Sequence, residues 1–128
     1  MTAEKKNILI VDDVEDVRVG MASILESDVR MVHTAANGLE GLEELKKLPF
    51  DLVISDILMP KMDGVEFASA ALELYPGIKF ILISGGGRQY IDGYDYLEAA
   101  QKITGIDHVL MKPFNPVELM SMVDELLS

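Results

Sequence analysis

The stretch ILIVDD at residues 8–13 decides the fold, because four apolar residues run directly into two acids. The pattern returns in LVISD at residues 52–56, and in VLMK at residues 109–112 an apolar run ends on a lysine. Short, fully apolar runs rich in β-branched residues are typical of strands buried on both faces. In a parallel sheet the carboxyl ends of such strands share one edge, where α/β proteins place their ligands. We therefore expect three carboxylates and one ammonium to converge on a site suited to a divalent metal and a phosphoryl group.

The rest of the chain alternates apolar runs with amphipathic stretches, which is typical of successive βα units. We expect strands at residues 8–11, 29–34, 50–55, 78–83 and 107–111. We expect helices at residues 14–25, from a cap at Asn37 to Leu48, at 65–75, at 91–104, and from a cap at Asn115 to the end of the chain. No linker, repeat or low-complexity segment interrupts this series. The pattern predicts one doubly wound α/β domain over residues 1–128, with a five-stranded parallel sheet and helices on both faces.

Composition excludes several classes of function. The 128 residues carry 11 Lys and Arg against 22 Asp and Glu, a net charge of −11 that argues against direct nucleic-acid or anionic-membrane binding. The absence of cysteine excludes disulfides, thiolate metal sites and cysteine catalysis. The amino terminus lacks the apolar stretch of a signal peptide, and no apolar segment approaches the roughly 18–20 residues that span a bilayer. We expect a cytoplasmic protein with no membrane partner.

The acids each have an ordinary structural interpretation as well. Asp13 can cap the following helix, with Asp16 at its third position, and Asp56 can cap a turn. Capping explains one such acid better than three at neighbouring strand ends, because close carboxylates repel one another and resist ionisation. A divalent cation removes this cost. Few carboxylates with room for water suit Mg²⁺ (or Mn²⁺) better than Ca²⁺, which prefers more protein oxygens.

Two further polar residues end predicted strands. Lys112 can be a solvated lysine that balances an acid, but beside a metal–carboxylate cluster it can neutralise a phosphoryl oxygen. Ser84 can offer a hydroxyl to the same group, or it can simply begin the turn that continues through Gly85. Pro113 restricts the backbone of the lysine before it, and a cis bond there would fix the direction of that lysine.

Four motifs together carry a family resemblance. ILIVDD, LVISDILMPKMDG, ILISGGG and VLMKPF occur in this order, each around the end of an expected strand. The chain resembles the receiver domain of two-component response regulators over essentially its whole length. The resemblance implies a flavodoxin-like sheet with strand order 2-1-3-4-5. We interpret the chain as a stand-alone receiver, with no output domain in this chain.

The resemblance implies a role for each site residue. Asp56 would attack the phosphohistidine of a sensor histidine kinase or a histidine phosphotransfer protein and become an acyl phosphate. The implied Mg²⁺ ligands are Asp12, Asp13, Asp56 and the backbone carbonyl of Leu58. Ser84 would be the switch hydroxyl and Lys112 the phosphoryl-binding lysine. The acyl phosphate would shift a two-state population that controls an unidentified output partner. Such a protein catalyses only its own phosphorylation and dephosphorylation and is not otherwise an enzyme.

The chain departs from the family pattern at its accessory positions. Val109 stands where the family commonly has an aromatic residue that turns inward on phosphorylation. Gly85 and Gly86 open a long glycine-rich stretch that contains Tyr90, Tyr94 and Tyr96. This stretch is either a surface loop or a replacement reporter of phosphorylation.

The residues two positions after Asp56 and Ser84 predict slow dephosphorylation. These residues are Leu58 and Gly86, and they flank the path of an attacking water. Neither side chain can orient that water. We therefore expect the acyl phosphate to be lost at an unassisted rate.

Three other interpretations remain open from the residues. A small Mg²⁺-dependent phosphatase with an aspartyl-phosphate intermediate usually needs a second acid two residues after its nucleophile, where this chain has Leu58. A flavodoxin-like electron carrier shares the architecture, but acids at the strand ends would repel a flavin phosphate. A receiver excised from a longer kinase or transcription factor fits the sequence equally well.

Overall fold

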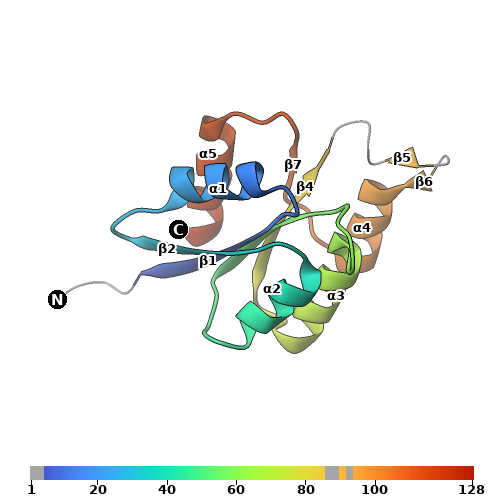
Figure 1. Ribbon diagram of the computed structural model, residues 1–128, viewed down its shortest axis with the longest axis horizontal. Helices are drawn as coiled ribbons and strands as arrows, with labels where there is room; N and C mark the ends of the chain where they lie inside the picture. The colour runs from blue at the N-terminus through green and yellow to red at the C-terminus, as the bar shows by residue number, and fades with distance from the viewer. Residues whose placement is uncertain (1–4, 86–89, 92–93) are drawn as a thin grey trace.

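The computed structural model describes residues 5–85, 90–91 and 94–128. Within them, a parallel sheet has the strand order β2-β1-β3-β4-β7 (Figure 1). Its strands are β1 (Lys6–Val11), β2 (Arg30–Ala35), β3 (Leu52–Asp56), β4 (Lys79–Ser84) and β7 (Val109–Met111). This order confirms the predicted doubly wound sheet.

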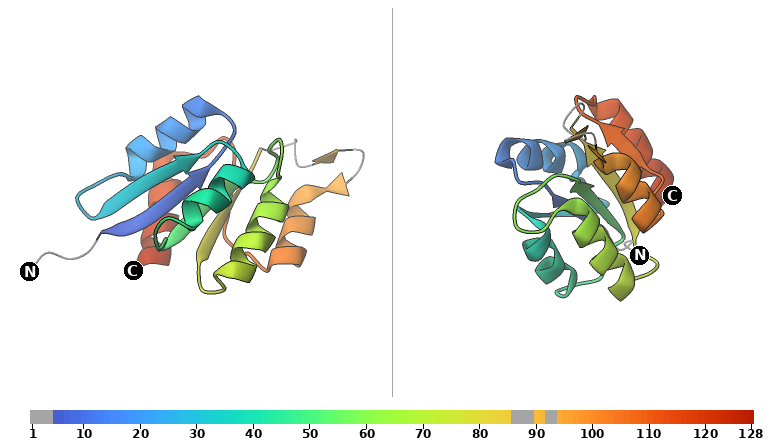
Figure 2. Two further views of the ribbon diagram at one scale, coloured as in Figure 1. Left: turned by 60° about the horizontal axis from the view of Figure 1, so that its bottom comes forward. Right: turned by 90° about the vertical axis from the view of Figure 1, so that its right-hand side faces the viewer.

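Helices cover both faces of the sheet. They are α1 (Glu15–Leu25), α2 (Gly38–Leu45), α3 (Gly64–Leu74), α4 (Tyr96–Thr104) and α5 (Pro116–Leu127). Figures 1 and 2 show α1 and α5 on one face and α2, α3 and α4 on the other. Both predicted caps are confirmed, because the side chains of Asn37 and Asn115 accept hydrogen bonds from the backbone N–H groups of Glu40 and Glu118.

The apolar runs form strands because each can fill two cores at once. In β1, Leu9 and Val11 belong to a buried cluster with residues of α2, α3 and α4. Ile8 and Ile10 point the other way, into a cluster with residues of α1 and α5. All four side chains are fully buried, and each contributes about 1.5–3 kcal/mol by leaving water. This two-sided burial fixes the sheet and therefore the edge at which its strands end.

The structure corrects one predicted helix. Residues 91–104 do not form a single helix, since α4 begins only at Tyr96. Before it lies a two-stranded antiparallel ribbon of β5 (Tyr90–Ile91) and β6 (Tyr94–Asp95). Glycine is a poor helix former, and tyrosine and isoleucine favour extended backbone, so local preference overrides the weak helical periodicity here.

Smaller differences lie at element ends. The apolar periodicity of residues 14–25 predicts Val14 on the buried face of the first helix, but Val14 is the N-cap of α1, has extended backbone and is 41% exposed. The spacing of Leu39, Leu42, Leu45 and Leu48 predicts an apolar stripe, but Leu39, at the start of α2, is 49% exposed. The last strand begins at Val109 rather than at residue 107. Both exposed residues lie at the start of a helix, so the apolar stripe alone does not set where burial begins.

Candidate functional site

The three predicted acids meet at the carboxyl edge of the sheet. Asp56 ends β3, and Asp12 and Asp13 follow β1, whose Val11 pairs in register with Ser55 of β3. The two strands are direct neighbours, so their ends deliver the acids to one place. One carboxylate oxygen from each acid lies within 4.8 Å of those of the other two. This is a donor set of oxygens, which is the ligand type that Mg²⁺ prefers.

The acids differ in burial and in hydrogen bonding. Asp12 is fully buried, Asp56 is 5% exposed and Asp13 is exposed. Asp12 Oδ1 accepts a hydrogen bond from the Val14 N–H at 2.9 Å, and Asp56 Oδ1 accepts one from the Ile57 N–H at 2.8 Å. Backbone donors therefore orient both buried carboxylates. The capping alternative for Asp13 is not supported, because Val14 is the N-cap and no side chain caps α1.

Lys112 joins the two buried acids from the far side of β4. Its Nζ lies 3.3 Å from Asp12 Oδ2 and 3.3 Å from Asp56 Oδ2. Its backbone N–H donates to the carbonyl of Ser84 at 2.8 Å, which fixes the start of the loop after β7. The Lys112–Pro113 peptide bond is cis, as the sequence allowed. The predicted ammonium thus belongs to the same cluster as the predicted acids.

The charges at this edge do not balance. Burial raises the pKa of Asp56 above its usual value, and the neighbouring Asp12 raises it further, against the lowering effect of Lys112. Burial acts to lower the pKa of Lys112, but attraction to Asp56 and Asp12 and hydrogen bonds to both outweigh it, so this pKa is raised. Lys112 therefore does not fully offset the burial of Asp56 and its repulsion by Asp12. The site favours an additional cation.

Ser84 and Gly85 lie beside the acids. Ser84 is the last residue of β4 and is 1% exposed. In the register of β3 and β4, Asp56 pairs with Ile83, one position before Ser84. Gly85 follows at the same edge. The switch role of Ser84 remains a prediction that this placement supports.

Two other accessory positions pack against the core, and a third falls outside the described residues. Val109 and Leu58 are partly buried, and both pack against the cluster formed with α2, α3 and α4. Gly86 lies outside the described residues, as do the side chains of the three tyrosines at 90, 94 and 96. Val109 therefore packs against this core with a side chain smaller than the aromatic ring that the family commonly has there.

Sequence reasoning missed the contribution of Gly64. The Gly64 N–H donates to the carbonyl of Ile57 at 2.6 Å. A Cβ at this position would lie 2.2 Å from the Asp56 carbonyl oxygen and 2.7 Å from the Ile57 Cα. The first turn of α3 therefore packs directly on the backbone that carries Asp56. The glycine after Asp63 was visible in the sequence, but the contact that requires it is not local.

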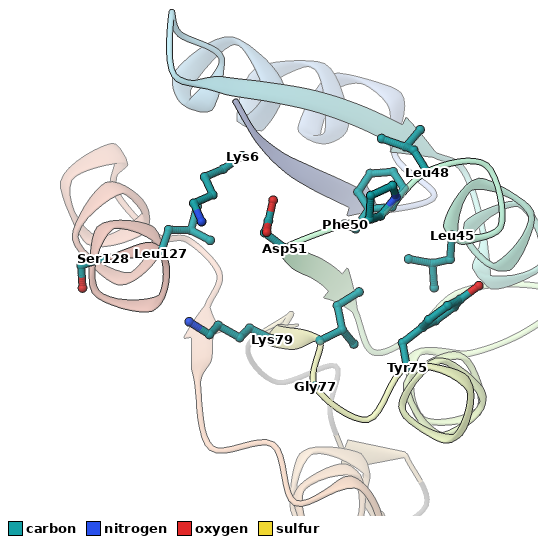
Figure 3. A pocket seen from close by; sticks show the side chains of 12 residues that line it. Lys6, Leu45, Leu48, Phe50, Asp51, Tyr75, Gly77, Lys79, Leu127 and Ser128 are labelled. Carbon is teal, nitrogen blue, oxygen red and sulfur yellow. The ribbon is translucent and has the colours of Figure 1, made fainter. Parts of the chain in front are cut away.

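A hollow of about 500 Å³ lies at the opposite edge of the sheet (Figure 3). Its lining comes from the start of β1, the segments before β3 and β4, and the end of α5, and it includes Lys6, Asp51 and Lys79. The amino ends of the strands form this edge, so the hollow is separate from the acids. Within the described residues, no helix is long and apolar enough to cross a membrane.

Comparison with known proteins identifies the class. The model of the response regulator receiver domain matches residues 8–124, so the chain belongs to that family. It is 32% identical to the chemotaxis protein CheY of Halobacterium salinarum, over 96% of this chain and 98% of that protein. A CheY-like receiver domain structure from Methanospirillum hungatei superposes with a TM-score of 0.85 at 34% identity, covering 97% of this chain and 94% of that one.

The chain also matches parts of longer proteins. It is 32% identical to the uncharacterised transcriptional regulatory protein YesN of Bacillus subtilis and 36% identical to the sensor kinase CckA of Brucella abortus. It spans 32% of the first and 12% of the second. Family membership makes the chain a phosphoacceptor of two-component signalling, and it does not favour the phosphatase alternative.

Proposed function

We propose that Asp56 is the residue that accepts the phosphoryl group, in a reaction that depends on Mg²⁺ or Mn²⁺. One observation carries this proposal. Three carboxylates at one sheet edge each have an oxygen within 4.8 Å of an oxygen of the other two, and the Lys112 ammonium bridges the two buried carboxylates. Asp12, Asp13 and Asp56 would hold the metal together with the Leu58 carbonyl. The raised pKa of Asp56 supports this fit, because burial and repulsion from Asp12 raise it and a bound cation would offset both effects. When bound, the metal supplies charge neutralisation to the transferring phosphoryl group.

The chain's own residues account for the nucleophile. Asp56 Oδ1 is held by the Ile57 N–H, which leaves Oδ2 to attack phosphorus. As the new O–P bond forms, the P–N bond of the phosphohistidine breaks and the imidazole nitrogen keeps the electron pair. Lys112 already lies 3.3 Å from Oδ2 and would bind an oxygen of the incoming group. Positioning and charge carry most of the catalysis in such transfers.

The acyl phosphate would act through the end of β4. We assign Ser84 as the switch hydroxyl, with Gly85, Gly86, Val109 and Pro113 as accessory positions. β4 leads from Ser84 toward the β5–β6 ribbon and α4, so a shift of the hydroxyl toward the phosphoryl group would reach α4 through the chain. Val109 packs against the cluster that includes Ala100 of α4 and offers no ring to rotate. The response would therefore shift α4 without an aromatic switch.

The partners follow from the chemistry of the donor. A sensor histidine kinase or a histidine phosphotransfer protein would supply the phosphoryl group, and an output partner would read the α4–β7–α5 face. We propose that the chain acts in the cytoplasm as a single receiver domain and catalyses only its own phosphoryl transfer. Matches to a full-length CheY and to parts of longer regulators support both a stand-alone receiver and the receiver part of a larger protein.

Phosphorylation by a small donor tests the proposal. The protein is incubated with acetyl phosphate and Mg²⁺, and its intact mass is measured. We expect the mass of one added phosphoryl group. This addition should not occur when a metal chelator is present, and it should not occur in Asp56→Asn. Asp107→Asn is the matched control, because Asp107 is exposed before β7 and should leave labelling unchanged. Labelling that survives Asp56→Asn would refute the assignment, and steady phosphate release without a labelled protein would favour a phosphatase.

A further inference from the structure

Arg18 contacts the backbone of the acid site from the first helix. It belongs to the opening turns of α1, and its side chain is partly buried. Its Nη1 donates a hydrogen bond to the backbone carbonyl of Asp12 at 2.8 Å. The Asp12 carbonyl precedes the helix, since the first helical acceptor is the carbonyl of Val14, which bonds the Arg18 N–H at 3.0 Å. Arg18 therefore satisfies an acceptor that α1 itself leaves unpaired.

The position is an unfavourable one for a cation. The amino end of a helix carries partial positive charge, so an arginine there is less stable than an acid. Glu15 and Asp16 lie in the same turn, yet across the part of the chain that the structure describes no carboxylate lies within the 4.0 Å ion-pair distance of the Arg18 guanidinium. The Arg18 guanidinium instead contacts the backbone carbonyl of Asp12. Residues that break a local rule often do so at functional sites.

With this bond Asp12 is held at every polar group. Its N–H donates to the carbonyl of Ala35 at 3.2 Å, and its Oδ1 accepts from the Val14 N–H. Its Oδ2 faces Lys112, and its carbonyl accepts from Arg18. The turn at residues 12–14 carries two of the three acids. The arginine fixes this turn from the helix side.

We propose that Arg18 is a positioning residue that pre-organises Asp12 and Asp13 for the divalent cation. The inference rests on the proposed metal-dependent function. Residues that hydrogen-bond a metal-ligating residue, without touching the metal, typically contribute about tenfold or more to metal affinity. Arg18 acts through the backbone of Asp12 and touches neither the metal nor the phosphoryl group.

The sign of the effect separates positioning from simple charge. Removing a cation near an acidic site should strengthen Mg²⁺ binding, because the site becomes more negative. Removing the anchor of the turn should weaken Mg²⁺ binding, because the acids lose their fixed arrangement. Arg18→Ala removes both charge and anchor, whereas Arg18→Lys keeps the charge and loses the planar fork of donors.

Calorimetric titration with Mg²⁺ tests the proposal on the whole chain. We expect Arg18→Ala to weaken Mg²⁺ binding roughly tenfold, and Arg18→Lys to weaken it as well. In the metal-free protein, hydrogen exchange at the Val14 amide should accelerate in both variants. Lys46→Ala, which removes an exposed cation after α2, is the matched control and should bind Mg²⁺ like the wild type.

Each other outcome overturns one claim. Tighter or unchanged Mg²⁺ binding in Arg18→Ala would refute positioning, even if the variant melts at a lower temperature. If Arg18→Ala does not fold, unchanged binding in Arg18→Lys refutes it in the same way. A wild-type protein that does not bind Mg²⁺ would instead refute the metal-dependent function on which the inference rests.

Discussion

Asp56 carries a conflict between its burial and its charge. The side chain is nearly inaccessible and lies with Asp12 beside one lysine, so ionisation costs more than it would in water. The folded protein therefore holds the proton on Asp56 to a higher pH than the unfolded chain does. Stability gained from this proton is complete below the ordinary value of 3.8 and disappears as the pH rises through the raised pKa.

Asp56→Asn should for this reason stabilise the metal-free protein at neutral pH. The amide keeps the shape of the side chain and has no charge to bury. We expect the free energy of unfolding to rise at pH 7, on the order of 1 kcal/mol, the usual size of a single-site effect. Urea unfolding at a series of pH values measures it. The advantage should shrink toward acid pH, and a variant less stable than the wild type at pH 7 would contradict the stated balance of charges.

Leu58 should make the acyl phosphate long-lived. Its side chain is partly buried, packs against the cluster formed with α2, α3 and α4, and carries no polar atom, so it cannot hold a water in line with the phosphoryl group. Leu58→Asn places an amide at this position, and we expect phosphate loss to become several-fold faster. Leu74→Asn serves as the control, because Leu74 is 55% exposed at the end of α3. Equal decay rates, timed by intact mass after removal of the donor, would contradict the prediction.

At the scale of elements, α3 sets the position of the phosphoacceptor backbone. Gly64→Ala would force a methyl group against the Asp56 carbonyl, and backbone atoms cannot yield as a flexible side chain does. We expect a loss of about 1–3 kcal/mol in unfolding free energy and slower phosphorylation. Gly77→Ala is the matched control, because open space surrounds Gly77. Unfolding and acetyl phosphate labelling measured on both variants decide the matter, and a Gly64→Ala protein that behaves like the control would refute the close contact.

Elements were predictable where local and non-local preferences agree. The runs around Ile10, Ile54 and Ile83 are apolar, β-branched and buried on both faces. Their local preference and their burial both favour a strand, so the strands could be predicted from sequence. The segment before Tyr96 has short-range preferences that oppose its periodicity, and there the helix prediction was wrong. Val14 shows that a periodic stripe gives the phase of a helix but not the residue at which burial begins.

The candidate site was predictable for the same reason that the sheet was. Asp12, Asp56 and Lys112 follow strands, so predicting the strands also placed these residues at one edge. Gly64 and Arg18 act through contacts between elements. Their roles depend on distances of a few ångströms between a helix and a loop, which no local pattern encodes.

For the whole molecule, metal binding should be coupled to folding. Only the folded sheet brings three acids together, so Mg²⁺ should bind the native state far better than the unfolded chain. At a Mg²⁺ concentration one hundred times the dissociation constant, we expect about 2.7 kcal/mol of added stability. Thermal unfolding with and without the ion measures this. Asp13→Asn should lose most of the gain, and an equal gain in that variant would place the ion elsewhere.

The β5–β6 ribbon bears on how such a chain can be re-engineered. Its two strands pair with each other and form a sheet of their own, while the main sheet passes directly from β4 to β7 (Figure 1). The described strands of the main sheet therefore pair with one another and not with the ribbon. The segment between Ser84 and Tyr96 could be replaced by a segment of different length. Chimeras built in this way would test whether this connection carries the proposed readout.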